Sequence, residues 1–175
     1  MRKLILGKQG TGKTTLIVNE IIPTLGDNYR VVDFCDEYSQ WIDESRIIKY
    51  GPVQGAQLKS AVIATIREMN KDTVLIIDNA EQLYFPKASC PKDLGFEWLE
   101  LELERKQYVL VFQSIERVLT GGIGGTYNPE LYEEVIIFIT RDDAEERERY
   151  LDALKRQAIG VFEQAELITA IKSKK

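Results

Sequence analysis

The chain of 175 residues contains no histidine and only two cysteines, Cys35 and Cys90. The absence of histidine excludes histidine-based catalytic triads and histidine metal ligands. Two cysteines so far apart in sequence predict neither a zinc knuckle nor a disulfide framework, so we expect reduced thiols.

Long apolar runs and a basic excess are also missing. Runs such as residues 135–139 are far too short to cross a bilayer, and a strand-like segment stands at the start in place of a signal peptide. With 23 basic and 28 acidic side chains, the net charge is −5, so any nucleic-acid contact should be local. We therefore expect a cytoplasmic protein with no membrane insertion. A hydrophobic content of 44% is ordinary for one globular domain.

What the chain does have is a phosphate-binding motif. Residues 7–14 read GKQGTGKT and fit G-x-x-x-x-G-K-[ST] at every fixed position, between a strand-like run and a segment with helical spacing. The amides of such a loop bind phosphate oxygens, the lysine reaches the β- and γ-phosphates, and the hydroxyl ligates Mg²⁺. The predicted nucleotide-binding residues are Gly7, Lys8, Gln9, Gly10, Thr11, Gly12, Lys13, Thr14 and Thr15. No Asn-Lys-x-Asp run is present, which disfavours a GTPase.

Strand-like and helical segments alternate along the rest of the chain. We predict an α/β fold, a three-layer P-loop NTPase with a mostly parallel central sheet and helices on both faces. Residues 1–141 should form the ATPase core, and residues 142–175 a C-terminal helical segment. The expected further strands are 29–35, 46–50, 73–78, 108–113 and 134–140, and the clearest further helices are 58–69 and 92–106.

Polar residues at strand ends are the candidates for chemistry. Asp78 ends a buried strand and is predicted to be the second Mg²⁺ ligand. The next residue is Asn79, whose amide can orient water but cannot accept its proton. Glu81 and Glu37 are the carboxylates that could replace a base there, and a solvated surface carboxylate is the alternative for each.

Three further candidates lie after later strands. Gln113 could contact the γ-phosphate or the attacking water, or it could simply cap its strand. Arg117 and Arg141 could act as arginine fingers in a neighbouring subunit, or they could be surface arginines. The glycine-rich loop 121–127 could reach DNA in a central pore.

Together these segments resemble one family. Residues 1–22, the stretch from Asp78 to Pro86 with the strand before it, and residues 109–114 are similar to the HerA/FtsK superfamily of P-loop ATPases. The stretch from Asp78 to Pro86 is similar to its zonula-occludens-toxin-like branch, and the small size to viral genome-packaging ATPases. Asn79 departs from the acidic residue usual at that position, and the membrane anchor of toxin-like members is missing.

The resemblance implies a homohexameric or similar ring that hydrolyses ATP with Mg²⁺ and pulls double-stranded DNA through its pore. Lys13 and Thr14 would hold phosphate and Mg²⁺, Asp78 would be the Walker B residue, and Gln113 the polar sensor. The missing anchor favours a free packaging motor, in the host cytoplasm or the virion, with a capsid or portal partner.

Other functions remain open from the sequence alone. Residues 76–83 are also similar to AAA+-like loader or initiator ATPases, which a compact C-terminal helical lid would support. A small-molecule phosphotransferase is a third possibility. Asn79 motivates a fourth, a nucleotide-gated DNA-binding protein that hydrolyses ATP slowly.

Overall fold

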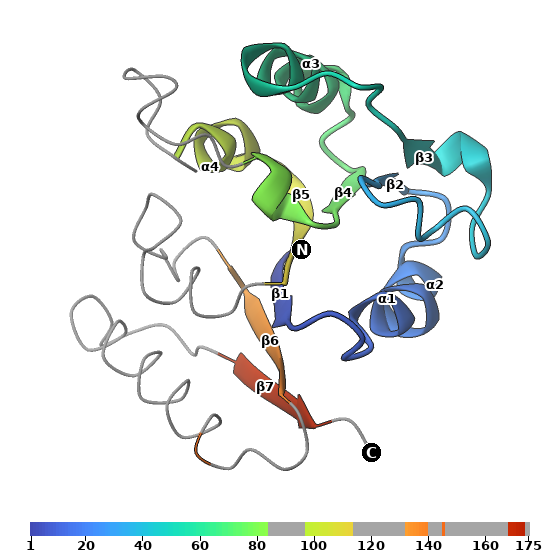
Figure 1. Cartoon of the computed structure of the whole chain (residues 1–175), viewed down its shortest axis with the longest axis vertical. Helices are drawn as coiled ribbons and strands as arrows, with labels where there is room; N and C mark the ends of the chain where they lie inside the picture. Colours follow the sequence, from blue (N-terminus) through green and yellow to red (C-terminus); the bar gives the residue numbers. More distant parts are fainter. Residues whose placement is uncertain (84–96, 114–131, 140–144, 146–167, 174–175) are drawn as a thin grey trace.

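The computed structural model describes residues 1–83, 97–113, 132–139, 145 and 168–173 (Figure 1). In this part of the chain, seven strands form one sheet in the order β3-β2-β4-β5-β1-β6-β7, and all neighbouring strands are parallel. The strands are β1 Arg2–Gly7, β2 Tyr29–Val32, β3 Ile47–Ile48, β4 Val74–Ile77, β5 Gln107–Phe112, β6 Glu134–Ile139 and β7 Ile168–Ser173.

Alternating side chains of the central strands fill two separate cores, one on each face of the sheet. On β1, Leu4 and Leu6 belong to one core and Ile5 to the other. All three are fully buried, which is why the strand sequences are almost entirely apolar. Helices cover both faces, so the prediction of a three-layer α/β fold is confirmed.

The helix after the phosphate-binding loop covers one face. It comprises α1 (Lys13–Leu16), the π-helical turn η1 (Ile17–Ile21) and α2 (Ile22–Leu25) without a break. The wider turn ends two residues before Pro23, whose missing N–H removes one bond of the α-helical ladder. Its buried side chains, Leu16, Ile17 and Ile21, pack against the sheet.

The opposite face is covered by α3 (Gly55–Glu68) and α4 (Glu97–Leu103), which lie side by side. Leu58, Val62 and Ile66 form the buried stripe of α3, at the spacing that the sequence predicts. Figure 1 shows these two helices on the other side of the sheet from α1 and α2. No helix in the described residues is long and apolar enough to cross a bilayer.

The C-terminal part differs from the sequence-based expectation. Residues 168–173, expected within a helical segment, form β7 instead and pair with β6 along its whole length. The helical prediction is therefore wrong for these six residues. An apolar run at the end of a chain fits an edge strand as well as a helix, and only pairing with β6 decides between them. The remainder of the 142–175 segment, apart from residue 145, lies outside the described residues.

The strand order determines which residues meet. Because β5 lies between β1 and β4, and β2 lies beyond β4, the segments after these four strands emerge at one edge of the sheet. This edge carries the loop after β1, the Asp33–Glu37 segment after β2, Asp78 after β4 and Gln113 after β5.

Candidate nucleotide-binding site

The phosphate-binding loop is held by its own hydrogen bonds. The backbone N–H and the hydroxyl of Thr11 both donate to the carbonyl oxygen of Lys8, at 3.3 and 2.8 Å. Gly10 and Gly12 adopt φ values of 74° and 97°, which side-chain-bearing residues rarely reach. The loop then leads directly into α1, so its amides and the helix N-terminus face the same region.

Lys13, the first residue of α1, turns its ammonium group back onto this loop. Its Nζ donates to the carbonyl oxygens of Gly7, at 2.7 Å, and Lys8, at 2.9 Å. Only 7% of the residue is exposed, and this burial lowers the pKa of Lys13 against the opposing charge of Asp78. The loop thus fixes a partly desolvated positive charge at its centre.

An open cleft of about 390 Å³ lies in front of the loop. Residues from β1, β2, β4 and β5 segments reach it, as the strand order requires. The cleft brings together the predicted residues Lys13, Thr14, Asp78 and Gln113 with Glu37, one of the two carboxylates that the sequence offered as a base. Its lining consists of Gln9, Gly10, Gly12, Lys13, Thr14, Thr15, Glu37, Asp78 and Gln113.

Asp78 is nearly buried in this cleft, with 4% of its surface exposed. Its Oδ1 accepts the backbone N–H of Asn79 at 2.9 Å. Burial raises the pKa of Asp78 to about 6, and the negative charges of Glu37 and Asp33 act in the same direction. A cation bound beside this carboxylate would relieve that electrostatic cost.

The oxygen atoms at the cleft suit Mg²⁺. Thr14 offers a hydroxyl and Asp78 a carboxylate, the hard donors that Mg²⁺ prefers. No cluster of three or more acidic, cysteine or histidine side chains suited to a metal occurs in the described residues.

Asn79 links two strand ends rather than facing the cleft. Its Nδ2 donates to Cys35 Sγ at 2.9 Å, and its Oδ1 accepts a hydrogen bond from Gln113 Nε2. The residue has a φ of 50°, in the left-handed region that asparagine tolerates. The backbone N–H of Gln113 donates in turn to Glu81 Oε1. Glu81 therefore holds Gln113 and does not line the cleft.

The segment after β2 contributes more than the sequence indicated. Asp33 accepts the backbone N–H groups of Cys35, at 3.1 Å, and Tyr38, at 2.9 Å. Tyr38 is fully buried, and this burial, together with the charge of Asp78, raises the pKa of its hydroxyl. No local sequence pattern identifies Tyr38 as a support of the site, because nothing local shows that β2 lies beside β4.

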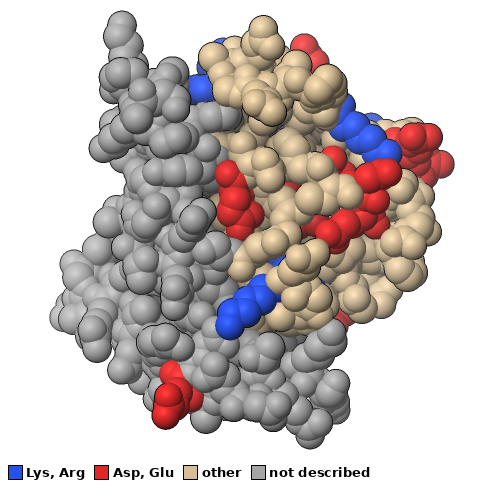
Figure 2. Space-filling view, viewed as in Figure 1, with Lys and Arg blue, Asp and Glu red and all other residues tan. Residues whose placement is uncertain are grey.

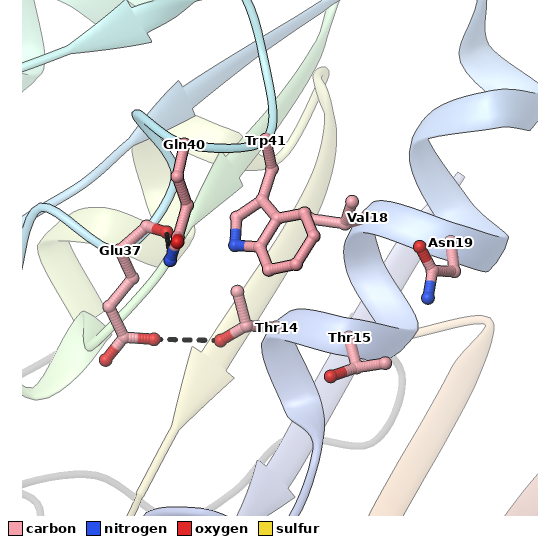
Figure 3. A pocket seen from close by; sticks show the side chains of 7 residues that line it. All are labelled: Thr14, Thr15, Val18, Asn19, Glu37, Gln40 and Trp41. Carbon is pink, nitrogen blue, oxygen red and sulfur yellow. Dashed lines mark hydrogen bonds between the residues drawn. The ribbon is translucent and has the colours of Figure 1, made fainter.

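A second, smaller hollow of about 260 Å³ adjoins the cleft and shares Thr14, Thr15 and Glu37 with it. Figure 3 shows the indole of Trp41 lying over the gap between Thr14 and Val18. The residue is 59% exposed, which is unusual for so large an apolar side chain. No sequence motif includes Trp41, so its place beside the cleft emerges only from the fold.

The acidic character of the site agrees with the composition. In the described part of the face in Figure 2, acidic atoms gather in several groups and no broad basic area occurs. Arg117, Arg141 and the 121–127 loop lie outside the described residues, so their predicted roles stay predictions.

Comparisons with known proteins place the fold. The genome packaging NTPase B204 from Sulfolobus turreted icosahedral virus 2, in complex with ATP-gammaS, matches with 18% identity and a TM-score of 0.58, covering 93% of this chain and 88% of that one. The same NTPase in complex with sulfate matches with 17% identity and a TM-score of 0.58 over 98% of both chains. The DNA-packaging ATPase B204 from Sulfolobus turreted icosahedral virus matches with 18% identity and a TM-score of 0.55, over 93% and 87%.

At this level of identity the likeness shows the fold, an α/β P-loop NTPase architecture. No protein-family model and no curated protein sequence matches this chain.

Proposed function

We propose that the chain is an ATP-hydrolysing DNA translocase that works as a homo-oligomeric ring, a hexamer or similar, and packages a viral or mobile-element genome. One observation carries the hydrolase part. Lys13, Thr14, Asp78 and Gln113, from three different strand ends, line a single cleft. The packaging part rests on the similarity to the genome packaging NTPase B204, whose structures include a complex with ATP-gammaS and a complex with AMP.

The chain's own residues would divide the work of phosphoryl transfer. The loop amides and Lys13 would bind the β- and γ-phosphates and stabilise the charge that develops there. Bound Mg²⁺, held by Thr14 and Asp78, would supply further charge neutralisation. The Gln113 amide is fixed by Asn79, so its remaining polar atoms could orient water or a γ-phosphate oxygen.

The proposal is tested by ATP turnover with and without double-stranded DNA. We expect turnover that DNA stimulates and that Lys13→Ala lowers by about 100-fold or more, because Lys13 acts on the transition-state charge. Lys71→Ala is the matched control, since Lys71 is exposed in the turn before β4, at the opposite edge of the sheet. Sedimentation with ATP-gammaS should show assembly. Absent turnover with no assembly would contradict a motor, and normal turnover in Lys13→Ala would contradict the loop assignment.

A slow, nucleotide-gated DNA-binding protein is the second candidate, favoured by Asn79 at the position after Asp78. Single-turnover rates of the wild type and Asn79→Glu separate the two. A large gain in the hydrolysis rate of Asn79→Glu would indicate that Asn79 keeps hydrolysis slow in the wild type. An AAA+-like loader depends on a C-terminal helical lid. In the described residues that segment contributes β7, which gives the loader no support.

A further inference from the structure

Two carboxylates, those of Glu37 and Asp78, line the nucleotide-binding cleft. The inference drawn from them rests on the proposed ATPase function and concerns the residue that activates water. Besides Glu37, the candidates for that role are Asp78 and its neighbours Asn79 and Glu81. Their contacts differ enough to separate them.

Asn79 and Glu81 are both engaged elsewhere. The amide of Asn79 bridges Cys35 and Gln113, and an amide has no useful basicity at neutral pH. Glu81 accepts the backbone N–H of Gln113 and is not part of the cleft lining. Both residues therefore position Gln113 rather than meet the substrate.

Asp78 is assigned to the metal. It is 4% exposed, and one of its oxygens accepts the Asn79 N–H. A carboxylate that binds Mg²⁺ is a weak proton acceptor, because the cation stabilises its ionised form. Among the described residues, Glu37 is then the remaining carboxylate that lines the cleft.

A hydrogen bond holds the Glu37 carboxylate beside Thr14. Its Oε2 accepts the hydroxyl of Thr14 at 2.9 Å, and Thr14 is the residue that would ligate Mg²⁺. Figure 3 shows the carboxylate pointing at Thr14 with its second oxygen turned away from that hydroxyl. The residue is half-buried and also lines the hollow beside Trp41, so water has access to it.

The turn that carries Glu37 is fixed on both sides. Asp33 accepts the backbone N–H groups of Cys35 and Tyr38, and the fully buried side chain of Tyr38 anchors the chain directly after Glu37. Asp36 adopts a φ of 57°, in the left-handed region, so the chain turns sharply just before Glu37. A left-handed backbone conformation at a residue other than glycine costs conformational energy, and such residues cluster at functional sites where they position side chains.

We propose that Glu37 is the general base of the reaction. One oxygen holds the Thr14 hydroxyl, and the other takes a proton from water. As that proton leaves, the water oxygen bonds to the γ-phosphorus. The bond from the γ-phosphorus to the bridging oxygen breaks, and its electrons pass to the β-phosphate of the departing ADP.

The test compares Glu37→Gln with Asp36→Asn. Glutamine retains an oxygen that can accept from Thr14 but cannot take a proton. Asp36→Asn removes one negative charge from the same turn at a side chain that is 66% exposed and outside the cleft lining, and asparagine tolerates its backbone conformation. Two quantities are measured, ATP-gammaS affinity by calorimetry and single-turnover ATP hydrolysis.

We expect Glu37→Gln to lower the hydrolysis rate by about 10²- to 10⁴-fold, the usual contribution of a general base. ATP-gammaS affinity should stay within about threefold, since the P-loop contacts are unchanged. Asp36→Asn should match the wild type in both quantities. Glu37→Asp, which keeps the carboxylate but withdraws it, should retain more activity than Glu37→Gln.

Three outcomes overturn the proposal. The first is ATP hydrolysis by Glu37→Gln within threefold of the wild-type rate. The second is a loss of ATP-gammaS affinity in Glu37→Gln with an unchanged rate per bound nucleotide, which would make Glu37 a binding residue. The third is the same loss of rate in Asp36→Asn as in Glu37→Gln, which would point to the charge of the turn. A wild type without turnover overturns the proposed function itself, and this inference with it.

Discussion

The side-chain amide of Gln113 donates a hydrogen bond to Oδ1 of Asn79, and this bond joins the ends of β5 and β4 at the cleft. The same asparagine is tied to Cys35 after β2. A chain of contacts therefore crosses three adjacent strand ends and fixes the orientation of Gln113. Asn79 therefore supports the site through its contacts, a role that its place after Asp78 in the sequence motif does not indicate.

Gln113→Ala should lower ATP turnover while leaving nucleotide affinity nearly unchanged, because the P-loop still binds the phosphates. Asn79→Ala should lower turnover too, since it releases the Gln113 side chain. The two effects should not add in the double variant, because they remove one shared contact. A purely structural Gln113 would instead lower the melting temperature with no change in rate per folded molecule.

Asp78→Asn should stabilise the nucleotide-free protein at neutral pH. Burial raises the pKa of Asp78 to about 6 from 3.8, so the folded state holds this proton more tightly than the unfolded state. The resulting stability is present below the unfolded pKa and is lost as pH rises through 6. At pH 7.5 the ionised wild-type carboxylate should cost on the order of 3 kcal/mol.

Urea unfolding of the wild type and Asp78→Asn at a series of pH values measures this difference. The advantage of the variant should shrink as pH falls from 7.5 toward 4, where the wild-type carboxyl is protonated in the folded state. A constant advantage across that range would contradict the raised pKa. Turnover should be lost in Asp78→Asn at every pH, because the amide is a poor Mg²⁺ ligand.

Gly7→Ala should destabilise the loop and the sheet together. A Cβ at this position would lie 2.7 Å from Thr11 Oγ1 and 2.8 Å from Phe138 Cβ, both too close. Such overpacking costs about 1–3 kcal/mol, and the displaced Thr11 should weaken nucleotide binding. Gly51→Ala is the control, since nothing lies within 4 Å of its added Cβ and its φ is not positive. Equal stability of the two variants in urea unfolding would contradict this packing argument.

Much of this site could be predicted from sequence, because its signals are local. The loop from Gly7 to Thr14 follows a strand and starts a helix, and Asp78 and Gln113 each end an apolar run. Parallel strands bring such ends to one edge, so the meeting of these residues follows from the fold class alone.

The remaining features depend on strand order, which local patterns do not encode. Asp33, Cys35 and Tyr38 support the site only because β2 lies beside β4. The same adjacency brings Glu37 to Thr14 and leaves Glu81 beside Gln113, a choice that the sequence left open. The pairing of β7 with β6 is likewise a long-range contact, and it turns a segment of helical appearance into a strand.

Trp41 should report nucleotide binding through its fluorescence. Its indole is 59% exposed beside a hollow that shares Thr14, Thr15 and Glu37 with the nucleotide cleft, so occupancy of the cleft should change its surroundings. The other tryptophan, Trp98, is 8% exposed and stacks under the ammonium of Lys59 on the opposite side of the sheet. A Trp98→Phe variant therefore isolates the signal of Trp41.

In that variant, Mg²⁺ and ATP-gammaS should change the emission and reduce acrylamide quenching, with a midpoint equal to the calorimetric dissociation constant. Adding Trp41→Phe should abolish the change without altering the affinity. Binding in the calorimeter with constant Trp41 emission would show that the hollow is independent of the cleft. The same titration on Glu37→Gln then separates the two roles of that residue. An unchanged midpoint with slow hydrolysis fits a base, whereas a weakened midpoint fits a binding contact.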